Sequence, residues 1–367
     1  MPDAATTPAG SRGRALLPGL LGVAAVVALA LLPRWVDSPY ALHLMVTFFL
    51  AVIMGEAWNL IGGYGGQYSV GHAAYFGIGA YTVLILLQEK GVAPWWGILP
   101  ALLLAVIVAA VVGSITFRLR GPYFVLASIA VAEIMRLAVL NWKSLTNGAE
   151  GILLSGVPPL VVGGTELVVF NSKVPYYYAG LALAVVVVLV TVWFQGSKVG
   201  YYLQAIREDQ DAANSLGIPL TLYKNVALAL SAFFTAFAGA LYGLYVGFID
   251  PQTAVGLDIS VQIVLTAIIG GIGTIFGPVV GAALLVALSE ALRSNAITDL
   301  LVASGVVSES SPVGLFLKDN LSHAHMLIYG LLVALVILFM PDGVLGAAKA
   351  YARKRRNRAA TVAGGAP

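Results

Sequence analysis

The sequence predicts an all-α, polytopic integral membrane protein with about eight to ten transmembrane helices. Three observations predict this class: the composition, the spacing of apolar segments and the distribution of basic residues. Of the 367 residues, 59% are hydrophobic and only 10% are charged, with a mean hydropathy of +0.91. A soluble domain carries about 25% charged residues, so this chain lacks the polar side chains that a soluble surface requires. No cysteine is present, which excludes disulfides and thiolate metal sites.

Ten apolar segments approach the length of roughly 20 residues that a transmembrane helix needs. A signal peptide is the alternative interpretation of the first apolar segment, because Arg12 and Arg14 precede it. However, the segment is long for a signal peptide and lacks a clear small-residue cleavage site. The eighth and ninth are short and interrupted by glycine, so the predicted count stays between eight and ten. The segments are about 15–33, 40–61, 69–88, 95–116, 122–141, 176–195, 223–248, 258–275, 277–293 and 324–340.

The basic residues support this arrangement through the positive-inside rule. With the N-terminus in the cytoplasm, the inner segments hold 13 of the 20 Lys and Arg residues and the outer segments hold six. The split predicts both termini in the cytoplasm, with an N-terminal tail at 1–14, a transmembrane domain at 15–345 and a basic tail at 346–367. The run RKRRNR (353–358) serves to fix topology, and contact with anionic membrane lipid is the alternative. The sequence pI of about 9.0 therefore gives no reason to expect nucleic acid as a partner.

The chain carries none of the motifs that mark common enzymes. It has no G-x4-G-K-[ST] phosphate loop, no H-E-x-x-H and no G-x-S-x-G. His323 and His325 are close in sequence, but residues at i and i+2 diverge on a helix, and a metal site there would require a loop. We therefore predict no catalytic residue and no metal site, and any uphill movement of a solute would draw its energy from another chain.

A polar, glycine-rich stretch separates the second and third predicted spans, and it reads GGYGGQYSVGHAAYFGIGAY (62–81). Its first four glycines are too dense for a helix interior, where each costs about 1 kcal/mol relative to Ala. We predict that the chain breaks there, which a membrane tolerates only where protein or a water-filled cavity satisfies the backbone. The following span is rich in small residues, and Ala73 and Gly77 have a spacing that permits close helix approach. The four glycines are Gly62, Gly63, Gly65 and Gly66.

A second glycine cluster, GGIGTIFGPVVGA (270–282), repeats part of the first. Corresponding glycine-interrupted segments in two halves of a transporter indicate its pathway. A tight turn between two helices is the alternative, and for the second cluster the sequence does not separate the two interpretations. The shared spacing relates Gly62, Gly63 and Gly65 to Gly270, Gly271 and Gly273.

Polar side chains near the first cluster extend the predicted path. Glu56 lies late in the second span, and a buried acid there faces either a cavity or a hydrogen-bonding partner. Gln67, Ser69 and His72 suit weak binding of a zwitterion, because they hydrogen-bond without fixed charge; alternatively they cap the broken helix. The predicted path residues are Glu56, Asn59, Gly65, Gly66, Gln67, Ser69, His72, Gly270, Gly271 and Gly273.

Two charged residues lie inside the fifth predicted span. Glu133 and Arg136 are separated by three positions and can pair on one helix face. We interpret this pair as structural.

The largest predicted inner loop, 196–222, contains a short amphipathic helix that Gly217 and Pro219 end. Such a helix suits contact with a peripheral partner, and a solvated loop is the alternative. One apolar stripe is predicted from Leu203, Ile206, Ala213 and Leu216. The charged residues between them are Arg207, Glu208, Asp209 and Asp211.

Several stretches of the chain resemble a known family. DAANSLG (211–217) is similar to the E-A-A-x3-G loop of ABC-importer permeases, with Asp211 in place of the glutamate. The Leu-Pro pair that follows this motif in other importer classes is not evident. Over roughly residues 40–345, the chain resembles the LivM-type permeases of branched-chain amino-acid importers. The stretches that carry this likeness are NLIGGYGGQYSVGHAAYFGIGAY, RGPYFVLASIAVAEIMRLAVLNW, GYYLQAIREDQDAANSLGI and GGIGTIFGPVVGA.

The resemblance implies a larger machine in a bacterial plasma (inner) membrane. Its other parts would be a related second permease subunit, two cytoplasmic ATPase subunits and an extracytoplasmic substrate-binding protein. ATP would bind to those partners, and this chain would bind no cofactor. The loop at 196–222 would dock on an ATPase, with Ala212, Ala213 and Gly217 allowing close approach. The charges of Arg207, Glu208, Asp209 and Asp211 would orient it.

The implied substrates are branched-chain or other hydrophobic amino acids. Related permeases are associated with urea, amides and aromatic acids, and the sequence does not discriminate among these. A secondary transporter driven by an ion gradient is the alternative from a different functional class.

Overall fold

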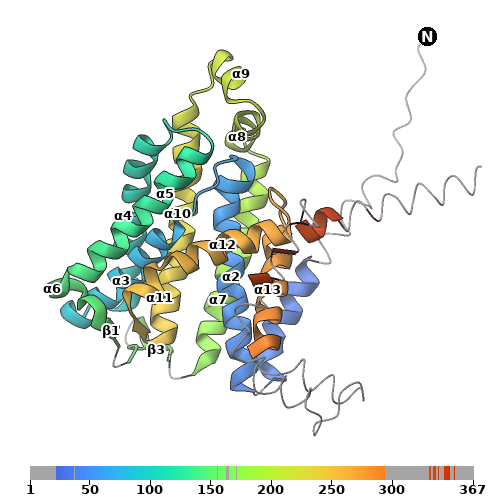
Figure 1. The fold of residues 1–367 in the computed structure, drawn as a ribbon. Helices are drawn as coiled ribbons and strands as arrows, with labels where there is room; N and C mark the ends of the chain where they lie inside the picture. Colours follow the sequence, from blue (N-terminus) through green and yellow to red (C-terminus); the bar gives the residue numbers. More distant parts are fainter. Residues whose placement is uncertain are drawn as a thin grey trace, which may run out of the picture.

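The computed structural model describes residues 22–36, 38–154, 156–162, 165–170 and 172–293, with a few positions between 330 and 351. These residues form a bundle of long helices, with two small pairs of strands at one end (Figure 1). Some of the predicted features lie outside the described residues. They are the tail at 1–14, His323 and His325, most of the span at 324–340 and most of the tail at 346–367.

The helices follow one another with short connections. An apolar helix, Gly22–Arg34, ends in the 3-10 turn η1 (Leu32–Arg34). The long helices are α2 (Pro39–Asn59), α3 (His72–Lys90), α4 (Pro94–Thr116), α5 (Pro122–Asn141), α7 (Lys173–Gln195), α10 (Leu220–Val246), α12 (Leu257–Gly270) and α13 (Gly277–Arg293). The short ones are the π-helical turn η2 (Leu60–Tyr64), α6 (Lys143–Thr146), η3 (Gly148–Glu150), α8 (Lys198–Glu208), α9 (Gln210–Ser215) and α11 (Pro251–Val255).

Four short strands close the end of the fold opposite α8 and α9 (Figure 1). β1 (Ile152–Leu153) pairs antiparallel with β4 (Phe248–Ile249), which joins the α6–α7 connection to the end of α10. β2 (Leu160–Val162) pairs antiparallel with β3 (Thr165–Val168). The connection between α6 and α7 is therefore fastened to the bundle.

Proline fixes the start of several helices. It stands at the first helical position of α2, α4, α5 and α11, where its missing N–H costs nothing. At α11, the Asp250 side chain accepts a hydrogen bond from the backbone N–H of Thr253, and the Thr253 hydroxyl interacts in return with the backbone of Asp250. This reciprocal pair is a capping box.

Six helical stretches of the described chain are long and apolar enough to cross a membrane. They agree with the second and the fourth to eighth predicted spans, although the eighth starts earlier than predicted, at Pro251, and ends at Gly270 rather than 275. The first and ninth predicted spans correspond to two shorter apolar helices, Gly22–Arg34 and Gly277–Ala291. The six are Pro39–Tyr64, Pro94–Thr116, Pro122–Asn141, Lys173–Gln195, Leu220–Val246 and Pro251–Gly270.

The third predicted span is the helix α3, which is not one of these six. Glycine, tyrosine and histidine lower its hydropathy, but most of its residues are buried inside the bundle. A helix that is surrounded by protein does not need an apolar surface for lipid. α3 is thus largely covered by neighbouring elements, mainly α10 and α4.

At the predicted position Gly77, α3 closely approaches Val255 and Ala254 of α11. Its approach to α10 is made at Gly79 instead. A side chain at Gly79 would collide with the backbone of Ala236, and one at Gly239 would collide with the backbone of Phe76. Glycine at both positions lets the two backbones come together. α10 also packs along α4, while α2 packs against α7, α12 and α13.

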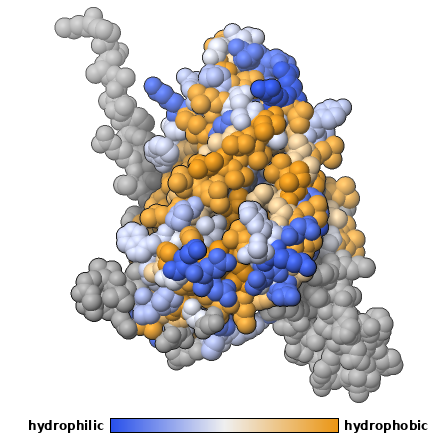
Figure 2. All heavy atoms as spheres, turned by 90° about the vertical axis from the view of Figure 1, so that its left-hand side faces the viewer, coloured by the Kyte–Doolittle hydropathy of each residue, from blue (hydrophilic) through white to orange (hydrophobic). Residues whose placement is uncertain are grey.

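α4 and α5 lie at the edge of the bundle, on the left of Figure 1. Only 28% of the apolar window of α4 and 17% of that of α5 are buried, against 72% for α2. Figure 2 shows this side of the molecule, with a broad hydrophobic band between hydrophilic residues at the top, near α8 and α9, and further hydrophilic residues in the lower part. The band agrees with a surface that faces the lipid or another membrane subunit.

Candidate functional site

The first glycine segment interrupts the helix later than the sequence predicts. Gly62 and Gly63 remain helical, because the end of α2 widens into the π-helical turn η2, which ends at Tyr64. The regular helix is left at Gly65 and Gly66, where Gly66 has a positive φ of 64°. The chain then runs without helix from Gly66 to Gly71. A π-helical turn absorbs glycines that a regular α-helix would not, and such turns often occur at functional sites.

The backbone of this non-helical segment is satisfied by protein groups. The Val70 N–H donates to Ser128 Oγ of α5 at 2.9 Å, and the Trp58 indole donates to the Ser69 carbonyl at 2.7 Å. Gln67 is buried and donates to the Gly65 carbonyl at 3.2 Å, while Ser69 Oγ accepts from the Gly71 N–H. Gln67 and Ser69 therefore make local bonds but do not cap α3, whose Ala73 N–H donates to Ser260 Oγ of α12 at 2.9 Å.

The second glycine segment is a tight turn between α12 and α13. α12 ends at Gly270, and both Gly271 and Gly273 have positive φ angles before α13 begins at Gly277. A side chain at Gly270 would collide with the backbone of Gly277. Of the two interpretations that the sequence left open, the turn between helices describes these residues.

The two glycine segments meet in space although 214 residues separate their linked positions. Asn59 joins them, since its side-chain oxygen accepts from the Gly273 N–H at 2.8 Å and its amide donates to the Thr274 carbonyl at 3.0 Å. Gly63 lies against Gly273 so closely that an added Cβ would be 2.7 Å from the Gly273 nitrogen. We call this contact of Gly63 with Gly273, held by Asn59, the glycine junction.

Arg207 connects the glycine junction to α8. Its Nη1 donates to the Gly63 carbonyl at 2.6 Å, and its side-chain carbons pack against Gly66. A Cβ at Gly273 would lie 2.7 Å from the same Nη1. One guanidinium therefore contacts both glycine segments.

α9 has two further connections to the membrane helices. Lys224 at the start of α10 is buried, and it donates to Gln210 Oε1 at 3.0 Å and lies over the ring of Phe117. Asp211 forms a bidentate ion pair with Arg120 of the α4–α5 connection, at 2.9 and 3.0 Å. Sequence reasoning used Lys224 and Arg120 only as topology signals and did not single out Gln210.

The remaining residues of the predicted docking loop differ in where they lie. Asp209 separates α8 from α9 and caps α9, because its carboxylate accepts from the N–H groups of Asp211 and Ala212. Ala213 is 2% exposed and faces the protein itself, whereas Ala212, Glu208 and Gly217 are exposed. Leu216 is 82% exposed, so the predicted apolar stripe is buried at Leu203, Ile206 and Ala213 but not at its last member.

A hollow of about 550 Å³ lies beside the first glycine segment. Gly66, Gln67 and Tyr68 form one wall, the start of α5 from Pro122 to Leu126 forms another, and Gln210 of α9 closes the end. Two of the predicted path residues, Gly66 and Gln67, therefore border an open space next to α9.

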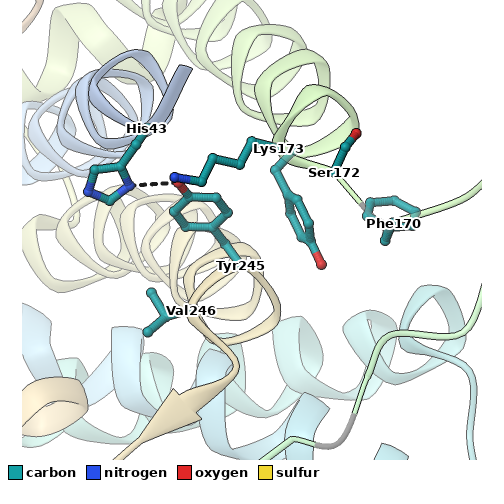
Figure 3. Close-up of a pocket in the computed structure, with 7 residues that line it drawn as sticks. His43, Phe170, Ser172, Lys173, Tyr245 and Val246 are labelled. Atoms are coloured by element: carbon teal, nitrogen blue, oxygen red, sulfur yellow. Dashed lines mark hydrogen bonds between the residues drawn. The ribbon is translucent and has the colours of Figure 1, made fainter. Parts of the chain in front are cut away.

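A second hollow, of about 400 Å³, lies at the opposite end of the bundle (Figure 3). His43 Nδ1 and the Tyr245 hydroxyl are 2.6 Å apart, and Lys173 and Phe170 line the same space. Sequence reasoning missed these residues. Their only signal was a histidine, a lysine and aromatic residues near the predicted ends of three spans.

One protein family, described as "Branched-chain amino acid transport system / permease component", matches residues 40–336. The chain belongs to this family. Among its curated relatives, the permease LivM of Salmonella typhimurium is 28% identical over 70% of this chain, and LivM of Escherichia coli K12 is 27% identical over 78%. LivH of Salmonella typhimurium is 25% identical over 84% of this chain and 97% of its own length. Each is named a high-affinity branched-chain amino acid transport system permease protein.

The permease matches part of the LivM proteins and nearly all of LivH. Its aligned region covers 64% of the Salmonella LivM and 72% of the Escherichia coli LivM. A solved structure of PsaBC from Streptococcus pneumoniae is 14% identical over 84% of this chain and 95% of that chain, with a TM-score of 0.40.

Besides Asn59, the predicted path residues Glu56 and His72 are fully buried among the helices. Glu56 lies beside Thr191 and Asn59, and neither of its carboxyl oxygens has a hydrogen-bond partner in the described chain. The Thr191 hydroxyl donates to the Val187 carbonyl instead. His72 Nε2 lies 2.8 Å from Ser231 Oγ of α10. Whether these residues contact a substrate stays a prediction.

Proposed function

We propose that this permease forms the membrane path of a bacterial ABC importer for branched-chain or other hydrophobic amino acids. ATP hydrolysis is assigned to separate subunits, and this chain has no enzymatic role. The observation that carries the proposal is the α8–α9 segment, which combines an E-A-A-x3-G-like sequence with direct bonds to three parts of the membrane domain.

The three bonds suggest how movement of an ATPase would reach the path. Arg207 leads to the glycine junction, Gln210 to α10 and Asp211 to the α4–α5 connection. The exposed Arg120–Asp211 pair contributes about 0–1 kcal/mol, so it orients α9 more than it holds it. Arg207 and Lys224 bond partly or fully buried partners and form the stiffer connections. A push on α8–α9 would therefore shift the π-helical turn η2 and the hollow beside it.

Leu216 supplies the contact that a partner would cover. Leu216 is 82% exposed, so burial in an apolar pocket of an ATPase would remove its side chain from water, worth about 1.5–3 kcal/mol when complete. Ala212 is also exposed and small, which allows close approach. Ala213 is proposed here as a packing residue of the segment, since it faces inward.

The proposed assembly includes a second, related permease, two ATPase subunits and an extracytoplasmic binding protein, in the inner membrane with both termini and α8–α9 in the cytoplasm. Support for the second permease comes from the relatives, because Salmonella typhimurium and Escherichia coli K12 each have a LivM and a LivH that this chain resembles. Urea, amides or aromatic acids are the alternative substrates.

Co-purification of the ATPase with the permease tests the docking surface. Leu216→Asp is expected to abolish co-purification, because a carboxylate would have to enter an apolar pocket. Leu222→Asp is the matched control, since it places the same change on an exposed leucine in the first turn of α10. Normal recovery of the ATPase with Leu216→Asp, or equal loss with both variants, would contradict the assignment.

A further inference from the structure

Helix α5 presents an exposed stripe along its whole length. The members of this stripe recur at spacings of three and four residues, so they share one face of the helix. All of them are exposed, on the least buried of the six apolar helices. They are Tyr123, Leu126, Ala130, Glu133 and Leu137. Such a seam is typical of a helix that faces another protein helix.

A charged pair sits in the middle of this stripe. Arg136 donates from Nη2 and Nε to the two carboxylate oxygens of Glu133, at 2.6 and 2.9 Å. The side chain of Glu133 is 47% exposed and that of Arg136 is 25% exposed. These bonds join the two side chains to each other, and in the described chain no hydrogen bond or ion pair links either one to another element. The pair therefore does not hold α5 to the bundle.

The depth of the pair argues against contact with lipid. Glu133 follows the first residue of α5 by 11 positions, which is about 16 Å at 1.5 Å per residue. The hydrocarbon core of a bilayer is about 30 Å thick, so the pair lies near its middle. Charged side chains at that depth face a protein interior or a water-filled path, and they mark substrate or ion pathways.

The stripe is continuous with the hollow beside the first glycine segment. Leu126 lines that hollow together with Gly66, Gln67 and Gln210, and Glu133 lies two helical turns further along the same face. One surface therefore runs from α9, past two predicted path residues, to the charged pair.

We propose that this stripe of α5 faces the translocation path against the second permease, and that Glu133 and Arg136 bind the charged groups of a zwitterionic amino acid there. Arg136 donates to the substrate carboxylate, and Glu133 accepts from the substrate ammonium. Arginine has five N–H donors, and two of them are used by Glu133. The pair has one positive and one negative side chain and no net charge. It therefore complements the two charges of a zwitterion without binding it so tightly that release is prevented. This inference rests on the proposed function and assigns the pair a role beyond helix pairing.

Leucine uptake by the assembled transporter in vesicles distinguishes this role from a structural one. Glu133→Gln and Arg136→Gln each leave one charge without its partner, so both roles predict loss for the single variants. The double variant carries no charge at all. A structural pair predicts that the double variant recovers wild-type uptake. The present proposal predicts that uptake stays reduced by about tenfold or more, as expected from the loss of charge-assisted hydrogen bonds, while ATPase binding and ATP hydrolysis without substrate are unchanged.

Recovery of wild-type uptake in the double variant would overturn the proposal. If the wild-type complex itself imports no amino acid, the proposed function fails, and this inference fails with it. Leu103→Ala, at an exposed position of α4 outside this stripe, is the control, and it should retain uptake because it removes no charge.

Thiol labelling tests the position of the stripe even if the double variant does not assemble. The chain has no cysteine, so a single cysteine can be introduced without background. Ala130→Cys in the membrane-embedded complex should react with a water-soluble thiol reagent. Leu103→Cys, at another exposed position, on α4, should not react, because it faces lipid. Absence of reaction at both positions would contradict a water-filled path along α5.

Discussion

Substitution of Arg207 tests the connection between α8 and the glycine junction. Arg207→Ala removes the 2.6 Å bond to the Gly63 carbonyl and leaves that carbonyl without its donor. A hydrogen bond from a charged group contributes roughly 1.5–3 kcal/mol, and we take about 2 kcal/mol. A free-energy change of 1.4 kcal/mol corresponds to a tenfold change in an equilibrium constant. The equilibrium between the intact glycine junction and one in which Gly63 and Gly273 have separated should therefore shift roughly 30-fold toward the separated form.

The exposed surface of α9 does not depend on this bond, because Ala212 and Leu216 belong to α9 and its C-cap whereas Arg207 belongs to α8. The ATPase should therefore still co-purify with Arg207→Ala, while leucine uptake per ATP hydrolysed falls about tenfold or more. Arg207→Lys keeps one charged donor and should recover part of the coupling. The control is Glu208→Gln, an adjacent exposed charge whose removal should cost about 0–1 kcal/mol. A wild-type ratio of uptake to hydrolysis in Arg207→Ala would refute the reasoning.

Three further predictions follow from the same geometry. Asn59→Leu breaks both bonds between the glycine segments and should lower the thermal unfolding temperature of the purified permease; an unchanged temperature would contradict the junction. Gly66→Leu should impair uptake while the complex still assembles, because φ is 64° and Arg207 lies against it; normal uptake, or failure of the protein to accumulate, would remove its path role. Ser172→Cys should react with an impermeant reagent on intact cells and Ser197→Cys should not; labelling of Ser197→Cys would contradict a cytoplasmic α8–α9.

The helices were largely predictable, since hydropathy, proline and glycine are local signals. The start of α5 at Pro122 and its end at Asn141 agree with the prediction, because proline stands at the first helical position. The helix that contains α2 was predicted to break from Gly62 onward, but the π-helical turn η2 continues it to Tyr64. The local sequence does not distinguish glycines in a π-helical turn from glycines that end a helix. The stripe that was predicted through Leu216 fails there because α9 ends at Ser215, which leaves Leu216 as its C-cap beyond the last helical turn.

The candidate site was predictable only in its parts. Asn59, Gly63, Gly273 and Arg207 were each singled out or close to a predicted feature, but the bonds that unite them span 144 and 214 residues. One sequence carries no signal for such distant pairs. Lys224 is similar, because its burial against Phe117 and Gln210 follows from the packing of α10 and not from its neighbours in sequence.

The energy source of transport tests the central claim most directly. Vesicles that contain this permease with its partner permease, ATPase subunits and binding protein would be assayed for uptake of labelled leucine, with ATP on the side of α8–α9 or with an imposed ion gradient alone. The account predicts uptake that requires ATP and the binding protein and that does not respond to the gradient. Uptake by the permease under an ion gradient, without ATP or the ATPase, would contradict it.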